Sequence, residues 1–357
     1  MGILRRVTLR CLCEDLVSDW RDVAQHRAFI ALRTAATTDE KDSAVVLALD
    51  EVPTTARAAH PLVESFYSAF ESNDSSVLRE SISGLTDPHW WKQKTSRWRG
   101  AATDAVVVGG DEAWLCAGGL RAGREARDFY VSFTTSVNQH GPDRYLPAVE
   151  DRRVQLVEEK LARRGAWTAQ LRLAALICLA EVDATGARRA LHVPRPSPAP
   201  VSTPLLHITF ELERVNDGDD EVLTEIFVTV EVEDHTAPNL VLSATATIRS
   251  VIESAADAWR VLPGAGRSEI WSALVTADAL AAAHRAVETG DVPEELADSA
   301  LVLGVRSHYA PKGHIVDASV DGNPVRGLCG QWFVPTTNPD TLPICPACKE
   351  KHESLAG

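Results

Sequence analysis

The sequence predicts an α+β protein in which a mainly helical N-terminal domain is followed by an antiparallel β-meander with helices and a small C-terminal module. Two observations predict this order. The hydrophobic period changes from about 3.6 residues to 2 after a Pro-rich segment, and three of the seven cysteines lie close together near the C-terminus. We therefore expect a helical domain at residues 1–190, a linker at 191–204, a sheet with helices at 205–300 and the module at 301–357.

The bulk properties set limits on these domains and on their partners. A chain of 357 residues is long enough for two or three compact units at about 150 residues each. Its hydrophobic content of 45% is typical of a globular protein. The net charge of -14 repels phosphate backbones on average, so the charge disfavours a nucleic-acid partner.

The sequence favours a cytoplasmic location. The N-terminus lacks the apolar core and small-residue cleavage site of a signal peptide. The longest apolar run, around Cys178, is too short to span a bilayer, so we expect a buried helix and no membrane partner. An odd number of mostly scattered cysteines fits a reducing compartment. The abundance of arginine and alanine is typical of a bacterial genome rich in G and C.

Helical spacing is clearest in two segments of the N-terminal domain. In the segment from His60, the apolar residues Leu62, Phe66 and Phe70 fall on one face of a helix. Asp74 is a candidate N-cap for a following helix. A long helical pattern covers 149–182, and Gly165 marks a candidate break within it.

The linker and the sheet are predicted from composition and alternation. Five prolines in the stretch HVPRPSPAPVSTP cannot sustain a helix or a central strand. Apolar residues then alternate with polar ones in LLHITFELERV and in EIFVTVEVED, and the turn-forming sequence NDGDD separates these two strands. NLVLSATATI is expected to be a third strand, and the meander has one water-exposed face.

That exposed face is acidic, because residues 205–260 contain twelve Asp or Glu and three Arg. A solvated surface explains this most simply, and a docking face for a basic protein partner is the alternative. Two helices are expected to follow, in 250–262 and 268–290. Ser268 is the expected N-cap of the second helix and Gly290 its end.

The cysteine cluster near the C-terminus has the spacing of a zinc site. Cys345 and Cys348 form a CxxC, and Cys329 is followed by glycine as in a zinc knuckle. A structural zinc ion needs four ligands in a tetrahedron, so three cysteines leave one position for another residue. Three histidines are candidates for the fourth ligand: His308, His314 and His352.

Three alternatives to a structural zinc site fit the cysteines less well. A redox CxxC would leave Cys329 without a role. A zinc deaminase needs an HxE motif and a proline before the first cysteine, and Ile344 occupies that position. Unrelated thiols without a metal are the third alternative.

The segment from Ser307 to Glu350 resembles an uncharacterised family of high-GC Gram-positive bacteria, the domain of unknown function 3039. The matching motifs are H-Y-A-P-K from His308, P-V-R-G-L-C-G ending at Gly330, a tryptophan, V-P, and P-I-C-P-A-C-K ending at Lys349. Gly327 stands where the family often has alanine. The resemblance implies a zinc-ribbon-like module and favours His308 as the fourth ligand, and it implies no activity.

An aromatic and basic segment is the best candidate for a contact with single-stranded nucleic acid. Tryptophan faces stack on bases, and lysine and arginine bind phosphates. Packing of the tryptophans into a core is the alternative. The residues concerned are Trp90, Trp91, Lys92, Lys94, Arg97, Trp98 and Arg99.

No catalytic motif stands out, so the sequence favours a protein that is not an enzyme. The first hypothesis is a cytoplasmic, zinc-binding interaction or scaffold protein, a component of a bacterial assembly in regulation or defence, with a protein partner. The second is a nucleic-acid-binding or nucleic-acid-processing enzyme that contacts its substrate through residues 90–100.

Overall fold

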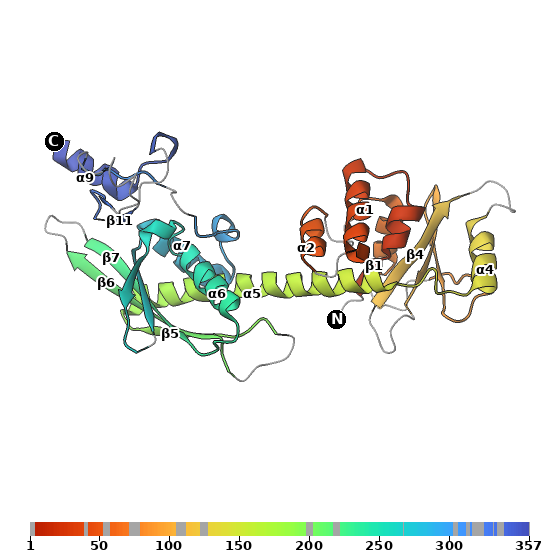
Figure 1. Ribbon diagram of the computed structural model, residues 1–357, viewed down its shortest axis with the longest axis horizontal. Helices are drawn as coiled ribbons and strands as arrows, with labels where there is room; N and C mark the ends of the chain where they lie inside the picture. The colour runs from red at the N-terminus through yellow and green to blue at the C-terminus, as the bar shows by residue number, and fades with distance from the viewer. Residues whose placement is uncertain are drawn as a thin grey trace. The chain divides into compact units, whose positions relative to one another are not determined.

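The structure is a computed structural model of the whole chain. It describes residues 4–38, 42–52, 58–70, 79–104, 112–121, 128–197, 203–216, 222–266, 268–302, 306–311, 315, 325–330, 332–333 and 339–356. The chain forms two compact units, Met1–Ala162 and Arg163–Gly357. Each unit contains helices and a sheet, as expected for an α+β protein (Figure 1).

The first unit is built around a four-stranded sheet in the order β1-β4-β3-β2. β1 pairs with β4 in parallel and the other pairs are antiparallel. Its strands are β1 (Leu4–Val7), β2 (Trp91–Lys94), β3 (Trp98–Thr103) and β4 (Glu112–Leu120). Its helical elements are η1 (Cys11–Asp15), α1 (Val23–Thr38), α2 (Asp42–Asp50), α3 (Pro61–Ala69), α4 (Phe129–His140) and the beginning of α5 (Val149–Thr185).

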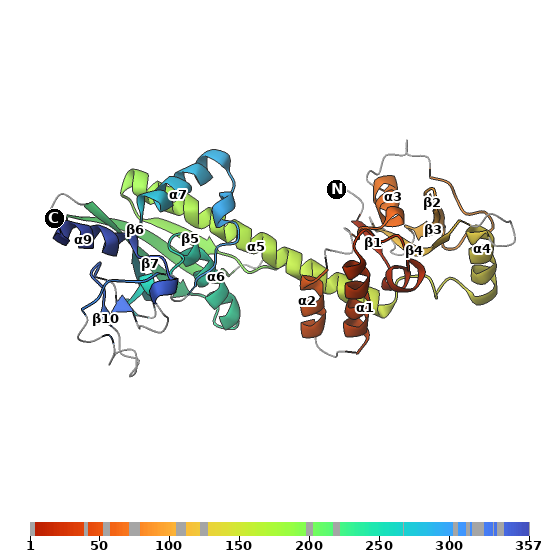
Figure 2. The same cartoon turned by 90° about the horizontal axis from the view of Figure 1, so that it is seen from above.

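Hydrophobic cores lie on both faces of this sheet because β3 and β4 alternate buried side chains between them. Trp98 and Leu115 pack in the core that contains residues of α1, α2 and α3. Trp114 and Ala117 pack on the other side against Phe133 of α4. The helices thus cover the sheet from two sides (Figure 2).

Two of the helical predictions for residues 1–190 are confirmed, and the sheet is the part they missed. The segment after His60 is helix α3, which buries Leu62 and Phe66, and the His60 side chain caps it by accepting from the Leu62 amide. The long pattern is helix α5, which continues through Gly165 without a break. Asp74 lies outside the described residues, and the described end of the helix expected after it, residues 79–82, is not helical.

The second unit contains a five-stranded antiparallel sheet in the order β5-β6-β7-β9-β8. The strands are β5 (Arg189–Val193), β6 (Leu206–Asn216), β7 (Val222–Val232), β8 (Arg260–Pro263) and β9 (Glu269–Leu274). Helices α6 (Pro238–Ser250) and α7 (Ala277–Thr289) complete this part of the unit, with the short turns η4 (Ala256–Ala258) and η5 (Glu294–Leu296).

The C-terminal module has short elements and lies in this same unit. It contains a two-stranded ladder of β10 (Val325–Arg326) and β11 (Trp332–Phe333), the turn η6 (Pro339–Thr341) and helix α9 (Pro346–Ala356). Hydrogen bonds between residues 254–256 and Val302 attach the chain leading into the module to the loop after α6.

The Pro-rich segment does not separate the two units. It connects β5 to β6, which pair directly from Arg189 with Phe210 to Val193 with Leu206. The units instead divide between Ala162 and Arg163, within α5. The prolines therefore mark a loop between two neighbouring strands of one sheet. Proline suits such a loop as well as it suits a linker between domains, so composition alone does not distinguish the two.

Three local predictions in 238–290 were wrong. The expected third strand is helix α6, because Pro238 begins a helix and Ala244, Thr245 and Ile248 are buried at helical spacing. The first expected helix, 250–262, ends in β8 and is not an α-helix, whereas the second, 268–290, begins as β9 and is helical only in α7, which ends at Gly290 as expected. Local periodicity does not reveal the pairing of β9 with β7 and β8. Ser268 is consequently not an N-cap. Thr276 caps α7 by accepting from the Ala279 amide.

The two faces of the second sheet have different surroundings. Ile208, Phe210 and Val228 pack in the core with residues of α5, α6 and α7. The register places Glu225 beside Leu274, and Arg260 beside Ser272, on the opposite face. The alternation in β6 and β7 thus produces one apolar and one polar face, as the sequence predicted.

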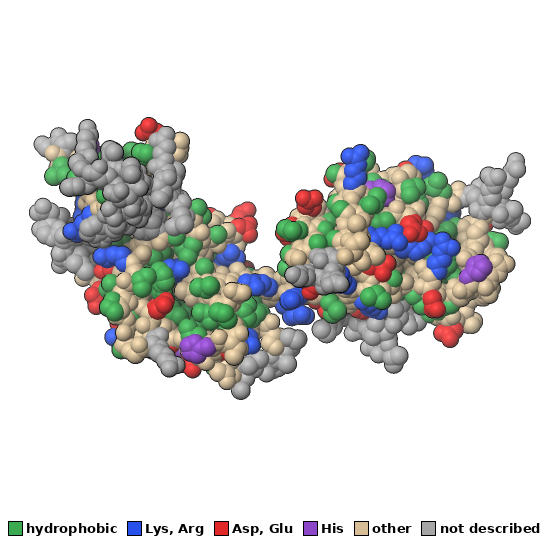
Figure 3. Space-filling view, viewed as in Figure 1, with side chains coloured by type: hydrophobic (Ala, Val, Ile, Leu, Met, Phe, Trp, Pro, Cys, Tyr) green, Lys and Arg blue, Asp and Glu red, His purple; other side chains and the backbone are tan. Residues whose placement is uncertain are grey.

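Two acidic side chains of the polar face are paired with arginines of the same unit. Arg188 contacts Glu211 at 2.8 Å, and Arg260 contacts Glu225 at 2.6 Å. Acidic and basic side chains are interspersed on the face of each unit that Figure 3 shows. These pairs reduce the negative field that the composition of 205–260 implies.

Helix α5 passes the length and composition test for a membrane span, and within the described residues no other helix does. A core helix of a water-soluble protein passes the same test. The apolar residues Leu171, Leu176 and Leu179 of α5 are buried in the core of the second unit. This packing supports the expectation of a buried helix around Cys178.

Candidate metal centre

A short parallel bridge holds His308 beside the CxxC segment. The Ser307 amide donates to the carbonyl oxygen of Pro343 at 2.9 Å, and the Cys345 amide donates to that of Ser307 at 2.8 Å. The chain before His308 and the chain before Cys345 are therefore adjacent. This places two potential ligands side by side although 37 positions of sequence separate them.

A tight turn presents Cys329. The Gly330 amide donates to the carbonyl oxygen of Gly327 at 2.8 Å, and Gly330 has a positive φ of 90°. Glycine accepts this conformation without the steric cost that a β-carbon adds. The Leu328 amide donates to Tyr309 at 2.6 Å, so the turn is attached to the residue after His308.

Helix α9 positions the other two cysteines. Cys345 directly precedes Pro346, the first residue of the helix, and its carbonyl oxygen accepts from the Lys349 amide at 3.0 Å. Proline suits a first helical position because that amide has no partner within the helix. Cys348 follows in the first turn and is fully buried. The CxxC thus spans the beginning of a helix.

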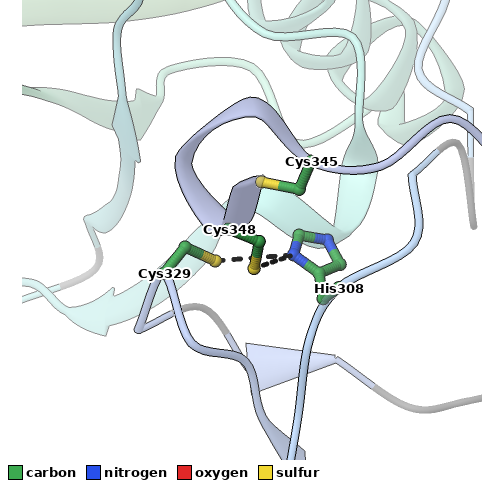
Figure 4. Close-up of side chains that lie close together, drawn as sticks. All are labelled: His308, Cys329, Cys345 and Cys348. Atoms are coloured by element: carbon green, nitrogen blue, oxygen red, sulfur yellow. Dashed lines mark hydrogen bonds between the residues drawn. The ribbon is translucent and has the colours of Figure 1, made fainter. Parts of the chain in front are cut away.

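The four side chains converge on a common point (Figure 4). The His308 Nδ1 lies 3.4 Å from the Sγ of Cys329 and 3.7 Å from the Sγ of Cys348. The ligating atoms of His308, Cys329, Cys345 and Cys348 all lie within 4.8 Å of one another. These residues are close enough to bind one metal ion.

The separations agree with a tetrahedral arrangement of nitrogen and sulfur ligands. Zinc bonds of about 2.3 Å to sulfur and about 2.0 Å to nitrogen put the two ligand atoms about 3.5 Å apart at a tetrahedral angle. The two measured separations from His308 are within about 0.2 Å of that value. The residues therefore fit a four-coordinate metal ion.

The surroundings of Cys345 favour its thiolate form. A hydrogen bond from Cys329 lowers its pKa to about 3, against the opposing effect of burial, and bonds from His308 and the Cys348 amide add to the lowering. The thiolate is the form that binds metals. Cys345 is thus in its metal-binding form at neutral pH.

The cysteines elsewhere in the chain have the opposite property. Burial raises the pKa of Cys13 to about 12 and that of Cys178 to about 11, and it also raises the pKa of Cys11 and Cys116. These thiols stay neutral at physiological pH and are poor metal ligands.

The candidates for the fourth ligand have different positions. The His308 ring faces two of the sulfurs, whereas the His352 ring stacks on Tyr309 with the ring centres 4.4 Å apart. His314 lies outside the described residues. Of the two described histidines, His308 is the one in the cluster.

Phe333 is a supporting residue that the sequence analysis did not single out. Its ring stacks on the His308 ring with the centres 4.9 Å apart and the planes 30° apart. This contact restricts the orientation of the imidazole, which is how residues around a metal site usually support its ligands. No signal in the sequence marks this role, because the family motif includes the neighbouring Trp332 instead.

The tryptophans in 90–100 lie mostly in the core. Trp90 packs against Phe133 with ring centres 5.0 Å apart and is fully buried. Trp98 is also buried, and its indole nitrogen donates to Asp19 at 2.8 Å. Trp91 is partly exposed and donates to Asp104 at 3.1 Å. Two of the three rings are therefore not available to stack on bases in this conformation.

The basic residues of the same segment have partners within the first unit. Lys92 and Lys94 both pair with Glu80, and Arg97 pairs with Asp19 at 2.8 Å. Arg99 donates to the carbonyl oxygens of Thr95 and Trp98. The packing alternative thus explains the segment, and a nucleic-acid contact stays an untested prediction.

The comparisons with known proteins concern only the C-terminal module. No curated protein and no solved structure matches the chain. Residues 304–355 match a family model described as a protein of unknown function (DUF3039), which is the family that the motifs of this segment resemble.

Proposed function

We propose that the C-terminal module holds one structural zinc ion through His308, Cys329, Cys345 and Cys348. The observation that supports this most strongly is the convergence of four ligand atoms from three separate parts of the chain within 4.8 Å. Three thiolates and an imidazole form a soft ligand set that suits zinc better than magnesium or calcium.

The proposed role of the ion is structural. Four protein ligands complete a tetrahedron and leave no open position for water or substrate, unlike a catalytic zinc site with three protein ligands. The module is short, and the strands in its described residues, β10 and β11, have two residues each. A metal ion therefore substitutes for the hydrophobic core that such a segment cannot build.

We further propose that the protein acts in the cytoplasm as an interaction or scaffold component of a bacterial assembly. A zinc-fixed module beside the polar face of a sheet gives a rigid surface for a protein partner, and a closed ligand set favours such a role over a reaction. The reducing compartment keeps the three ligating thiols from forming disulfides.

Elemental analysis tests the zinc proposal. We expect about one zinc per chain in the wild type and a clear loss in Cys345→Ser and His308→Ala. His352→Ala is the matched control, because it removes a neighbouring histidine outside the cluster. Full zinc content in both ligand variants would contradict the proposal.

Cobalt substitution tests the geometry independently. Cobalt(II) bound to three thiolates in a tetrahedron absorbs strongly in the visible range and shows thiolate-to-metal charge transfer. A weak, octahedral-type spectrum from the loaded protein would contradict the proposed ligand set.

The interaction proposal needs its own experiment. Tagged wild type and Cys345→Ser are purified from the native host under identical conditions, with Cys178→Ser as the control for a cysteine outside the cluster. We expect one set of proteins to accompany the wild type and the control and to be lost with Cys345→Ser. Purification of the zinc-loaded wild type alone would contradict an assembly role.

A further inference from the structure

A cavity of about 480 Å³ lies between the metal centre and the polar face of the five-stranded sheet, within the second unit. Its walls include Arg260 and Leu274 of the sheet, the turn at Cys329 and the first residues of α9. Its size is in the range of small-molecule sites in proteins. We call it the basic cavity, because its lining within the described part of the chain includes four cationic side chains and two carboxylates: Arg260, Arg306, Arg326, Lys351, Glu225 and Glu253.

The two carboxylates are engaged by the walls themselves. Glu225 accepts from Arg260 at 2.6 Å and from the Ser272 hydroxyl. Glu253 accepts from the Ala255 amide at 2.8 Å and contacts Arg306 at 3.3 Å. Both carboxylates are well shielded from solvent, so these pairs hold the two arginines in fixed positions at the edge of the cavity.

The guanidinium groups keep donors for a further acceptor. Each guanidinium carries five N–H donors. Among the described residues, the contact of Arg260 is with Glu225, that of Arg306 is with Glu253, and the Arg326 Nε donates to the Gly330 carbonyl oxygen at 3.3 Å. Within the described segments, these contacts leave most of the guanidinium donors for water or a ligand.

The charge balance of the cavity favours an anion. Among the described residues of its walls, cationic side chains exceed carboxylates by two. A divalent zinc ion with three thiolates and a neutral imidazole has a net charge of one negative unit. This charge does not cancel the excess of two positive side chains. The beginning of α9 adds the positive end of a helix dipole, since Pro346 and Ala347 line the cavity.

We propose that the basic cavity is a binding site for a small multivalent oxyanion, a phosphate or carboxylate compound held by Arg260, Arg306, Arg326 and Lys351. Arginine pairs with either group through two parallel hydrogen bonds. The net charge of -14 disfavours non-specific binding of anions to the protein. Saturable binding of an anion would therefore indicate a specific site. This proposal goes beyond the zinc site, which supplies one wall of the cavity.

Isothermal titration of the zinc-loaded full chain tests the proposal, with pyrophosphate and citrate as separate probes at constant ionic strength. We expect saturable binding of at least one probe, and the stronger probe tells a phosphate from a carboxylate ligand. Arg326→Gln and Lys351→Gln should each weaken it about tenfold, the effect of losing one charge-assisted contact.

Lys349→Gln is the matched control, because Lys349 lies on the same helix, is exposed and does not line the cavity. It should bind as the wild type does. Absence of saturable binding for both probes would overturn the proposal, and so would equal weakening in all three variants. Zinc content is measured on the same samples, so that the anion proposal and the zinc proposal can fail separately. A chain that contains no zinc and still binds the probe contradicts only the zinc proposal.

Discussion

The His308 Nδ1 lies 3.4 Å from the Cys329 Sγ, although 21 positions separate the two residues in the chain. Backbone hydrogen bonds produce this proximity, because Tyr309 accepts from the Leu328 amide directly beside both side chains. The contact brings an imidazole and a thiol together at a separation that a shared metal ion requires.

Phe333→Ala should weaken zinc binding by about tenfold or more without removing a ligand, because the His308 ring loses the aromatic surface that orients it. Competition with a chromogenic chelator measures the change in affinity. His352→Ala provides the comparison, since it alters a histidine that stacks on Tyr309 instead. Equal affinity of Phe333→Ala and wild type would show that the stacking contact has no role in metal binding.

Metal removal should unfold the module and leave the rest of the second unit folded. We expect the amides of Cys345 and Lys349 to lose their hydrogen-exchange protection in a strong chelator, because their bonds depend on a segment without its own core. Amides in the middle of α5 should remain protected. Persistence of the module's protection in metal-free protein would contradict a structural zinc ion.

Asp151→Ala should lower the free energy of unfolding by about 1–3 kcal/mol, because it leaves a buried amide without an acceptor. One carboxylate oxygen of Asp151 accepts from the Leu9 amide at 2.6 Å and the other from the Ala148 amide at 2.8 Å. Urea denaturation measures the loss. The exposed Asp143→Ala variant should change stability far less.

The same residue predicts a pH dependence. Burial is the largest cause of the raised pKa of Asp151, so the folded state holds its proton to higher pH than the unfolded state does. Its contribution to stability is complete below the ordinary aspartate pKa of about 3.9 and is lost as pH rises through the raised value. Asp151→Asn does not titrate, so its destabilisation relative to wild type should be smaller at neutral pH than in acid. A larger destabilisation at neutral pH would contradict this sign.

We expect no salt-sensitive binding of single-stranded oligonucleotides by the first unit, because Trp90 and Trp98 are buried and Arg97 pairs with Asp19. Fluorescence anisotropy at low and moderate salt measures this. Trp91→Ala combined with Arg97→Ala is the decisive variant. Binding by the wild type that this double variant abolishes would restore the nucleic-acid hypothesis.

The sequence predicted those features that depend on local pattern. Alternation in β6 and β7, the helical period of α5 and the end of α7 at Gly290 all follow from neighbouring residues. The four clustered residues were also named from the sequence, because their spacing and the family motifs are specific. The helix at 238–250 was missed because its alternating apolar residues fit both periods.

Features that depend on distant pairing could not be predicted in this way. β9 is a strand because it hydrogen bonds with β7 on one side and β8 on the other, and its own sequence is equally compatible with a helix. The basic cavity has the same origin. Arg260 and Lys351 are 91 positions apart and become neighbours of one cavity only through the fold.

Helix α5 supplies Val154 and Val157 to the core of the first unit. Its buried residues between Leu171 and Val182 belong to the core of the second unit. The boundary between the units therefore falls inside a continuous helix. Proteases cleave segments that can enter their active site as extended chain, so limited proteolysis should spare residues 160–166 despite their position at the boundary. A fragment designed to fold alone would need to retain the helical turns that its own core uses, and cutting at residue 162 leaves each fragment with a newly frayed helix end.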